Sequence, residues 1–399
     1  MNNEKQKPAL SGVERIVPEL RFPEFENNNI WEIKSLNSIS ENLNNRRVPI
    51  TSNVREKGNI PYYGATGVID YVKDYIFNEN LLLISEDGAN LIDRNYPIAY
   101  SISGKTWVNN HAHVLKPINE HIQIIVEKYI NSVSIEDYLT GQAQPKLNKA
   151  NLNKIPIPLP KNPKEQQKIA NCLSSLDTLI TAETEKLDHL KDHKKGLLQQ
   201  LFPANGETKP QFRFPEFKND GDWEIKEVGE IFEVTRGYVL SMSLVFEKQT
   251  EENNYPVYSS QTKNNGLAGY YKDFLYENAI TWTTDGANAG DVNYRDGKFY
   301  CTNVCGVLIN NNGMANKCIA ALINSVSKSH VSYIGNPKLM NGVMSKIEIP
   351  IPSLNEQIKI SEVITSADDL IEAQVLKIKN LKKHKKGLMQ QLFPNVNEL

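Results

Sequence analysis

The stretch that decides the fold is HKKGLLQQLFP at residues 193–203, because the chain repeats it as HKKGLMQQLFP at residues 384–394. Only Leu198, which becomes Met389, differs between the two copies. Such near identity within a chain of 399 residues indicates an internal duplication, and a duplication has to be recognised before any fold is predicted.

The repeated unit is about half the chain. Three further motifs recur in the same order: PELRFPEF from Pro18 with PQFRFPEF from Pro210, each followed by WEIK; ISEDGAN at 84–90 with WTTDGAN at 282–288; and PKL…KIPIPLP from Pro145 with PKL…KIEIPIP from Pro337. The segments between these motifs differ. A shared scaffold with divergent loops predicts one task performed on two different targets.

The charged segment before each HKKGL motif predicts a long helix of about 39 residues, roughly 58 Å at ~1.5 Å per residue. Apolar residues recur in alternating steps of four and three, which is the seam of a coiled coil. The seam residues are Leu173, Leu176, Ile180, Leu187, Leu190, Leu197 and Leu201 in the first copy, and Ile364, Ala367, Ile371, Ile378, Leu381, Leu388 and Leu392 in the second.

Polar residues interrupt both seams at matching places, Glu183 and Lys194 in the first copy and Gln374 and Lys385 in the second. Because one apolar stripe cannot be buried by an isolated helix, we expect the two helices to pack on each other, antiparallel. The alternative is two separate arms that pack on their own domains or dimerise between chains.

Between the repeated ends, short β-branched and aromatic runs alternate with turn signals, and short helices are expected around 120–133 and 315–325. The predicted fold class is therefore α/β (α+β), with two mixed α/β domains in a pseudo-two-fold tandem repeat and two long helices packed as an antiparallel coiled coil. The predicted domains are a flexible N-terminal extension at 1–17, a first domain at 18–160, a first long helix at 161–203, a second domain at 204–352 and a second long helix at 353–399.

Composition limits the class of protein. The chain shows no secretory signal and no apolar run long enough to span a membrane, so a cytoplasmic protein is expected. Four cysteines without zinc spacing suggest reduced core thiols and no metal site. With 45 basic and 47 acidic residues, the net charge of −2 requires any DNA-binding surface to be local or to be completed by a partner.

Catalytic motifs are missing: GxSxG, HExxH, GxGxxG and an Asn-Pro-Pro-Tyr type amino-methyltransferase motif do not occur. The best catalytic candidate is a metal-dependent nuclease cluster of Asp285, Asp291, Asp296 and Lys298. An Asp-Gly pair is more often a tight hairpin turn, and we also interpret the two DGAN sequences as hairpin turns.

Basic, aromatic and amide side chains near the DGAN turns and in the divergent loops are candidates for DNA contact, since Lys and Arg bind phosphates and Arg, Asn, Ser and Thr read base edges. The alternative is a solvated loop face. The candidates are Arg46, Arg47, Arg55, Lys57, Tyr62, Tyr63, Ser85, Asp87, Asn90 and Lys105 in the first half, and Arg236, Tyr238, Tyr258, Gln261, Lys263, Thr283, Thr284, Asp285, Asn288 and Lys298 in the second.

The order RFPEF…W, PKL…KIPIPLP, EQQKI and HKKGLLQQLFP, present twice, resembles the specificity subunit of a type I restriction-modification system from about Pro18 to Pro394. The resemblance implies a non-catalytic subunit with two target-recognition domains, each reading one half of a split, double-stranded DNA sequence. It also implies that the helices set the spacing and dock two methyltransferase subunits, and that motor-nuclease subunits complete the restriction complex.

In that family the cofactors belong to the partners: S-adenosylmethionine to the methyltransferase, and ATP and Mg to the motor-nuclease. The outward helix residues are then candidates for partner docking, with plain solvation as the alternative: Lys191, His193, Lys195, Gln199, Gln200, His384, Lys386, Gln390 and Gln391. The rival functions are a single-chain nuclease or methyltransferase with fused specificity, and a coiled-coil adaptor that binds no DNA.

Overall fold

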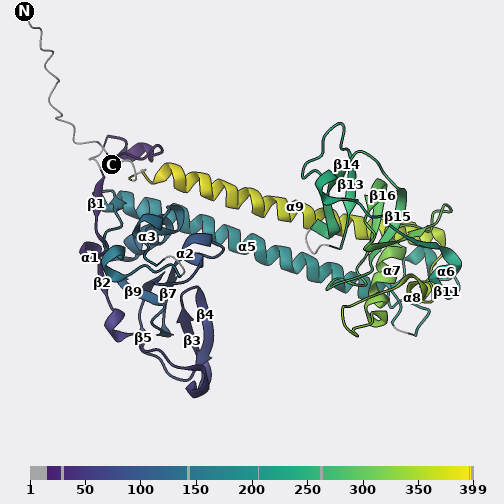
Figure 1. The fold of residues 1–399 in the computed structure, drawn as a ribbon, viewed down its shortest axis with the longest axis horizontal. Helices are drawn as coiled ribbons and strands as arrows, with labels where there is room; N and C mark the ends of the chain where they lie inside the picture. Colours follow the sequence, from purple (N-terminus) through teal and green to yellow (C-terminus); the bar gives the residue numbers. More distant parts are fainter. Residues whose placement is uncertain are drawn as a thin grey trace, which may run out of the picture. The chain divides into compact units, whose positions relative to one another are not determined.

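The computed structural model describes residues 16–27, 31–141, 144–204, 206–260, 264–394 and 396 (Figure 1). The first fifteen residues of the predicted N-terminal extension lie outside this range. The chain divides into two compact units: unit 1 comprises Met1–Thr184 with Leu376–Leu399, and unit 2 comprises Glu185–Val375. Each unit therefore contains one domain and one half of each long helix.

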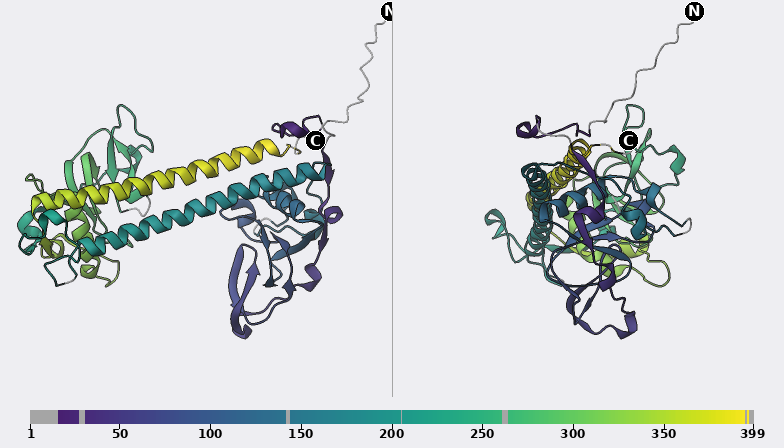
Figure 2. Two further views of the ribbon diagram at one scale, coloured as in Figure 1. Left: turned by 180° about the vertical axis from the view of Figure 1, so that it is seen from behind. Right: turned by 90° about the vertical axis from the view of Figure 1, so that its left-hand side faces the viewer.

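The two long helices, α5 at Pro163–Leu201 and α9 at Leu354–Leu392, both contain 39 residues. Within unit 1, Leu173 near the start of α5 shares a core with Leu392 at the end of α9. Within unit 2, Leu201 at the end of α5 shares a core with Ile360 near the start of α9. The helices thus pack antiparallel in each unit, as their seams predicted (Figure 2).

The polar interruption of the second seam is matched by an ion pair in unit 1. Lys385 of α9 donates to Asp177 of α5, and Lys128 of α3 (Glu120–Ser132) lies 2.9 Å from the same carboxylate. Burial by itself would raise the pKa of Asp177, but hydrogen bonds from the two ammonium groups lower it.

The first seam has the corresponding pair in unit 2. Lys194 of α5 donates to Asp368 of α9 at 2.6 Å, and Lys317 of α7 (Lys317–Ser327) lies 3.9 Å from Asp368. Because the two pairs occupy equivalent places in the two helices, the polar positions in the seams are specific partners that fix the antiparallel register.

Each long helix begins at a polar cap and ends before a proline. The Asn162 side chain accepts a hydrogen bond from the Lys164 amide at 2.9 Å, and the Ser353 hydroxyl accepts one from the Glu356 amide at 3.4 Å. Pro203 and Pro394 follow the last turns, where a proline cannot continue the helix.

A buried carboxylate in the first turn of α5 ties the RFPEF motif to the helix. Arg21 binds both carboxylate oxygens of Glu165 through Nε and Nη2, each at 2.7 Å, and the Trp31 indole donates to Glu165 at 3.2 Å. The side chain of Glu165 is only 1% exposed. A bidentate guanidinium pair of this kind fixes direction as well as distance.

The same arrangement occurs in the first turn of α9. Arg213 binds Glu356 through Nε at 2.9 Å and Nη2 at 2.8 Å, and the Trp223 indole donates to Glu356 at 3.2 Å. The hydrogen bond from Glu356 raises the pKa of Arg213. The RFPEF…W motif is therefore repeated because each copy supplies the partners of one helix-start carboxylate.

The residue before each of these arginines also contacts the other helix. The Leu20 amide donates to the carbonyl of Gln391 near the end of α9 in unit 1, and the Phe212 amide donates to the carbonyl of Gln200 near the end of α5 in unit 2, both at 2.9 Å. One short motif thus connects the start of one helix to the end of its neighbour.

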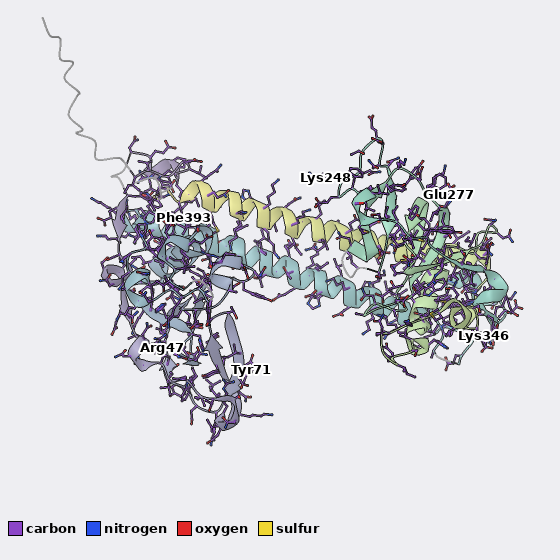
Figure 3. All side chains as sticks on the ribbon, viewed as in Figure 1. Arg47, Tyr71, Lys248, Glu277, Lys346 and Phe393 are labelled. Carbon is purple, nitrogen blue, oxygen red and sulfur yellow. The ribbon has the colours of Figure 1, made fainter. Side chains whose placement is uncertain are left out.

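The domain of unit 1 contains two four-stranded sheets and a two-stranded ribbon (Figure 1). Helix α3, capped by Asn119, packs on the first sheet, and its Tyr129 lies against Phe393, which Figure 3 labels, with 5.5 Å between the ring centroids. In order across each sheet, the strands are β2 (Ser40–Asn42), β9 (Ala112–Pro117), β6 (Leu81–Ser85) and β7 (Ala99–Ile102); β4 (Gly67–Val72), β3 (Lys57–Gly64), β8 (Lys105–Val108) and β5 (Phe77–Asn78); and the ribbon β1 (Glu32–Lys34) with β10 (Ile157–Leu159). The short helices are α1 (Leu36–Ile39), α2 (Asn90–Asp93) and α4 (Lys149–Leu152).

The domain of unit 2 repeats this plan with one continuous sheet of six strands and a ribbon. Strand β15 of unit 2 corresponds to β5 and β6 of unit 1 together, and β16 corresponds to β7 and β8. In sheet order the strands are β12 (Glu233–Arg236), β17 (Cys305–Ile309), β15 (Tyr276–Thr283), β16 (Val292–Cys301), β13 (Tyr255–Tyr258) and β14 (Leu267–Tyr271), and the ribbon pairs β11 (Glu224–Glu227) with β18 (Glu348–Ile351). Helix α7 packs on β16, and the short helices are α6 (Val228–Ile231) and α8 (Asn341–Met344).

The Asp296-Gly297 pair was predicted to form a tight hairpin turn, and this prediction is wrong. Both residues lie inside β16, opposite a register shift between Glu277 and Ala279. Asn278 and Gly297 both have positive φ angles, 48° and 68°, and the Asn278 side chain accepts from the Gly297 amide at 2.8 Å. The pair therefore forms a bulge that keeps the strands continuous.

We predict that Glu356→Gln destabilises unit 2 by about 3–5 kcal/mol, because Arg213 would keep its charge in a nearly buried site without a carboxylate partner. Urea unfolding of the full chain, followed by tryptophan fluorescence, measures the effect. The matched control is Glu362→Gln, an exposed carboxylate of the same helix, for which a change within ~0.5 kcal/mol is expected. Equal effects of the two substitutions would contradict the role of the buried pair.

Candidate nucleic-acid interface

Both DGAN turns are fixed by the PKL motif of their own unit. In unit 1 the Gly88 amide donates to the backbone carbonyl of Pro145 at 3.1 Å, and the Leu147 amide donates to the backbone carbonyl of Glu86 at 2.7 Å. In unit 2 the Gly286 amide likewise donates to the carbonyl of Pro337 at 3.0 Å, and the Leu339 amide donates to the carbonyl of Thr284 at 2.9 Å. The two motifs are therefore repeated together because they form one structural element.

The turns are not the tight hairpins that the sequence suggested. Residues 86–98, including α2, connect β6 to β7, and residues 284–291 connect β15 to β16. Gly88 and Gly286 have φ angles of 107° and 92°, which favour glycine. These longer connections place several polar side chains beside one end of each sheet.

Several DNA-contact candidates of unit 1 are engaged inside the domain. Tyr62 is 1% exposed and its hydroxyl accepts from the Ile50 amide at 2.9 Å. Ser85 is also buried, and its hydroxyl donates to the Ala65 carbonyl. In this conformation both side chains are buried and hydrogen-bonded within the domain, so a DNA contact by either one stays a prediction that requires a change of conformation.

Two arginines of unit 1 already have carboxylate partners. Arg47, labelled in Figure 3, donates to Glu86 at 2.6 Å and to the Ala112 carbonyl at 2.8 Å. Arg55 donates to Asp70 at 2.9 Å, and this bond lowers the pKa of Asp70. Their positive charges are largely neutralised within the domain, so they contribute less than free cations to phosphate binding.

The remaining candidates of unit 1 lie at least partly at the surface. Arg46 pairs with Glu79 at 2.9 Å, and the Lys105 ammonium lies 4.8 Å from the centre of the Tyr75 ring. Asp87 is hydrogen-bonded to the His111 ring at 2.9 Å. Lys57 is exposed, whereas Tyr63 and Asn90 are partly exposed. These side chains stay predicted DNA contacts.

In unit 2, Arg236 and Tyr238 are exposed, and the Lys298 ammonium lies 4.6 Å from the centre of the Phe274 ring. Thr284 is buried and donates to Asp285 at 2.7 Å, while Thr283 and Asn288 are partly exposed. Gln261 and Lys263 lie outside the described residues. The predicted DNA contacts of unit 2 therefore include both buried and accessible side chains, as those of unit 1 do.

The hypothetical nuclease cluster is not supported by the contacts. A carboxylate oxygen of Asp285 lies 3.8 Å from the Lys338 ammonium, and one of Asp291 lies 2.8 Å from the Lys328 ammonium. Both carboxylates are thus paired with lysines. Within the described part of the chain, no group of three or more His, Cys, Asp or Glu side chains is placed to hold a metal ion.

The predicted docking residues all lie on exposed faces of the long helices. In contrast, Lys194 and Lys385 between them are partly buried and paired across the helices. The exposed residues are Lys191, His193, Lys195, Gln199 and Gln200 on α5, and His384, Lys386, Gln390 and Gln391 on α9. Their docking role stays a prediction.

Sequence reasoning missed a polar cavity beside the DGAN turn of unit 2. Thr283 and Asn288, both predicted contacts, line it. Arg295 of β16 also lines it and is nearly buried, with its guanidinium 3.7 Å from the centre of the Tyr258 ring. Only an alignment of the two halves strand by strand could have revealed this arginine, because its neighbours in sequence carry no motif.

Trp282, which lines this cavity, belongs to one of two alternative cross-strand pairs. In unit 2 Trp282 lies opposite Gly306 and its indole donates to the Leu339 carbonyl at 3.0 Å. In unit 1 Ile84 lies opposite His113 at the equivalent place.

The His113 ring reaches the carbonyl that corresponds to that of Leu339. Its Nε2 lies 2.6 Å from the Leu147 oxygen, while Nδ1 lies 2.8 Å from the Asn44 amide nitrogen. Nδ1 therefore accepts and Nε2 donates, which is the neutral imidazole. Burial lowers the pKa of His113, in agreement with this form. An aromatic N–H holds the PKL motif in both units, but it comes from different strands.

The described residues thus form two copies of one domain with shared ends and different polar side chains, which is a protein built by internal duplication. A family model described as the type I restriction modification DNA specificity domain matches residues 28–192 and 220–383. These two matches cover more than half of the chain. The chain therefore belongs to the type I restriction-modification specificity family.

Individual proteins agree with this assignment. A Haemophilus influenzae protein assigned as a type I restriction enzyme specificity subunit is 38% identical over 152 residues, which are 38% of this chain and 38% of that protein. The specificity subunit of the type I restriction enzyme MpnII of Mycoplasma pneumoniae is 33% identical over 183 residues, 44% of this chain and 54% of that protein. Each alignment thus spans about half or less of the relative.

The fold agrees along nearly the whole chain. The crystal structure of a type I restriction-modification S subunit from M. genitalium has a TM-score of 0.66 at 15% identity, and the match covers 95% of this chain and all of the other. Among the helices in the described ranges, none is long and apolar enough to cross a membrane.

We predict that Gly306→His destabilises unit 2 by at least about 1–3 kcal/mol, because a Cβ at this position would lie 2.1 Å from the Trp282 indole. Adding Trp282→Ile should restore most of the loss, since it reproduces the arrangement of unit 1. Thermal unfolding of both single variants and the double variant measures the coupling.

The control is Gly342→His, where an added Cβ meets no atom within 4 Å. The interpretation fails if the double variant loses as much stability as the two single variants together, because the pair would then show no coupling.

Proposed function

We propose that this chain is a DNA-reading subunit in which each unit recognises one half of a split DNA sequence. The observation that carries the proposal is the duplicated frame with different groups at equivalent places, such as the cross-strand pairs beside the two DGAN turns. Family membership supplies the DNA target, and the divergence supports two different half-sequences.

The surface charges support binding that is completed by a partner. The chain has a net charge of −2, and Arg46, Arg47 and Arg55 are each paired with a carboxylate of their own domain. These three arginines are then less able to release counterions from DNA, and with a net charge near zero this chain alone is expected to bind DNA weakly. A basic partner surface would supply the remaining affinity, while the two units supply the sequence preference.

The proposed partners are two methyltransferase subunits and, in the full complex, motor-nuclease subunits. S-adenosylmethionine would be bound by the methyltransferase, and ATP and Mg by the motor-nuclease. The support in this chain is the repeated HKKGL motif, whose exposed residues give each long helix an equivalent surface near its end. Two equivalent surfaces suit two copies of one partner. The long helices would also set the distance between the half-sequences.

Co-expression with the methyltransferase subunit, followed by sequencing of methylated adenines in host DNA, tests the proposed function. The expected result is a split motif with a constant unspecified gap. An assembled complex that adds no methylation, or that methylates a continuous motif, would contradict reading by two units.

We predict that the double variant with Lys195→Glu and Lys386→Glu weakens association with the methyltransferase, since it reverses one charge in each proposed docking surface. Co-purification with the tagged partner measures the loss. The matched control reverses two other exposed helix lysines, through Lys186→Glu and Lys379→Glu, and should retain the partner. Unchanged assembly of the first variant would remove these residues from the docking surface.

A further inference from the structure

The cavity beside the DGAN turn of unit 2 is large enough for an organic group. Its volume is about 160 Å³, whereas a single water needs only ~10–15 Å³ of such space. Residues of β15, β16 and the segment before β14 line it, among them Ser259, Thr281 and Asn293. Polar atoms form most of the lining, which distinguishes the cavity from a packing defect in an apolar core.

A nearly buried cation forms one part of the lining. Arg295 is 8% exposed, donates through Nε to the Thr281 hydroxyl at 2.9 Å and through Nη2 to the Asn265 carbonyl at 2.7 Å, and lies against the Tyr258 ring. No carboxylate among the described residues forms an ion pair with it. The equivalent position in unit 1 is Ile102, so the fold itself does not require a cation here.

Hydrogen-bond acceptors form another part of the lining. Asp291 lines the cavity, its carboxylate is paired with Lys328 at 2.8 Å, and no ion pair joins it to Arg295. Asn288 and Asn293 also line the cavity, and their side-chain amides can both donate and accept. A ligand that fills the cavity therefore meets a strong donor at Arg295 and a strong acceptor at Asp291.

Unit 1 fills the equivalent space with apolar side chains. Its strands pair Leu83 with Tyr100 where unit 2 pairs Thr281 with Asn293. The Tyr100 ring packs on Tyr63, with 6.0 Å between the ring centroids. The same sheet forms with this space filled, so the fold does not require a polar cavity in unit 2.

We propose that this cavity receives one nucleobase of the DNA half-sequence read by unit 2, and that the base is guanine or cytosine. Both bases have a carbonyl oxygen that can accept from Arg295 and an amino group that can donate to Asp291. Adenine has no carbonyl, thymine has no amino group, and a phosphate has no donor for Asp291. The inference rests on the proposed function and adds a specificity-determining pocket to unit 2 alone.

A base reaches such a cavity only by leaving the DNA stack, at a cost of a few kcal/mol that the contacts inside must offset. The entering base would bind the guanidinium at its carbonyl edge, while the amides of Asn288 and Asn293 hold its remaining polar atoms. Replacing the preferred base by another at this one position of the DNA should therefore reduce the affinity as much as the loss of a good bidentate contact does, by about 1–3 kcal/mol or roughly 5–150-fold.

The test uses the full chain assembled with its methyltransferase. It also uses DNA duplexes that contain the sequence motif that the complex methylates. A fluorescent guanine or cytosine analogue replaces each G or C of the half-sequence read by unit 2, one at a time. The variant Asn293→Tyr fills the cavity with the ring that unit 1 has at this position. The control is Asp296→Asn, on the same strand but outside the cavity lining. Asn293→Ala is a second variant, which removes the amide without adding bulk.

We expect the fluorescence of one analogue to rise on binding, as for a base that leaves the stack. With Asn293→Tyr this rise should disappear and the preference for that base should fall at least fivefold, with the other half-sequence read as before. Asn293→Ala should weaken the preference in the same direction, and Asp296→Asn should leave it unchanged. If Asn293→Tyr does not fold, the alanine variant decides the outcome.

The inference is overturned if every analogue stays stacked, or if both Asn293 variants keep the full base preference. Guanosine and cytidine monophosphates, added to the complex without DNA, test a free nucleotide as the source of the base. Suppose that one of these nucleotides binds, that Asn293→Tyr abolishes this binding, and that every analogue in the DNA stays stacked. This result would overturn DNA as the source of the base. A wild-type complex without any sequence preference would instead refute the proposed function, and this inference with it.

Discussion

The structure depends on one buried carboxylate at the start of each long helix. Glu165 and Glu356 are almost fully buried, and each is held by an arginine and a tryptophan from a segment more than a hundred residues earlier. A carboxylate without those partners would be strongly destabilising in such a site. The start of the helix, the RFPEF motif and the ribbon that follows therefore form together or not at all. The amides of Leu20 and Phe212 extend this constraint to the end of the other helix, so each unit closes around both helices.

The helices could be predicted from the sequence because their signals are local. The four-and-three spacing predicted the faces that pack together, and the polar residues Lys194 and Lys385, which interrupt the two seams at matching places, are paired with Asp368 and Asp177. The turn assignments were less successful. Asp296-Gly297 has the local sequence of a hairpin, but the two residues form a bulge whose geometry depends on Asn278 across the sheet. Local turn preference cannot show which residue lies opposite.

The candidate site was only partly predictable for the same reason. Residue type correctly placed polar groups beside the DGAN turns, but burial separated Tyr62 and Ser85 from accessible side chains such as Lys57 and Lys105. Arg295 was missed because only a comparison of the two units distinguishes it: the equivalent residue in unit 1 is the apolar Ile102. The exchange of Ile84 and His113 for Trp282 and Gly306 is equally invisible in one strand alone. Comparing equivalent strand pairs of duplicated domains therefore separates the positions that the shared fold requires from the positions that are free to differ.

The central claim is that one duplicated frame carries two independent readers. It is tested most directly by replacing residues 40–110 with the corresponding segment of another member of the family, and sequencing the adenines that the assembled complex methylates. The account predicts that one half of the split motif changes, while the other half and the gap remain as they were. A change in both halves would contradict independent reading by the two units.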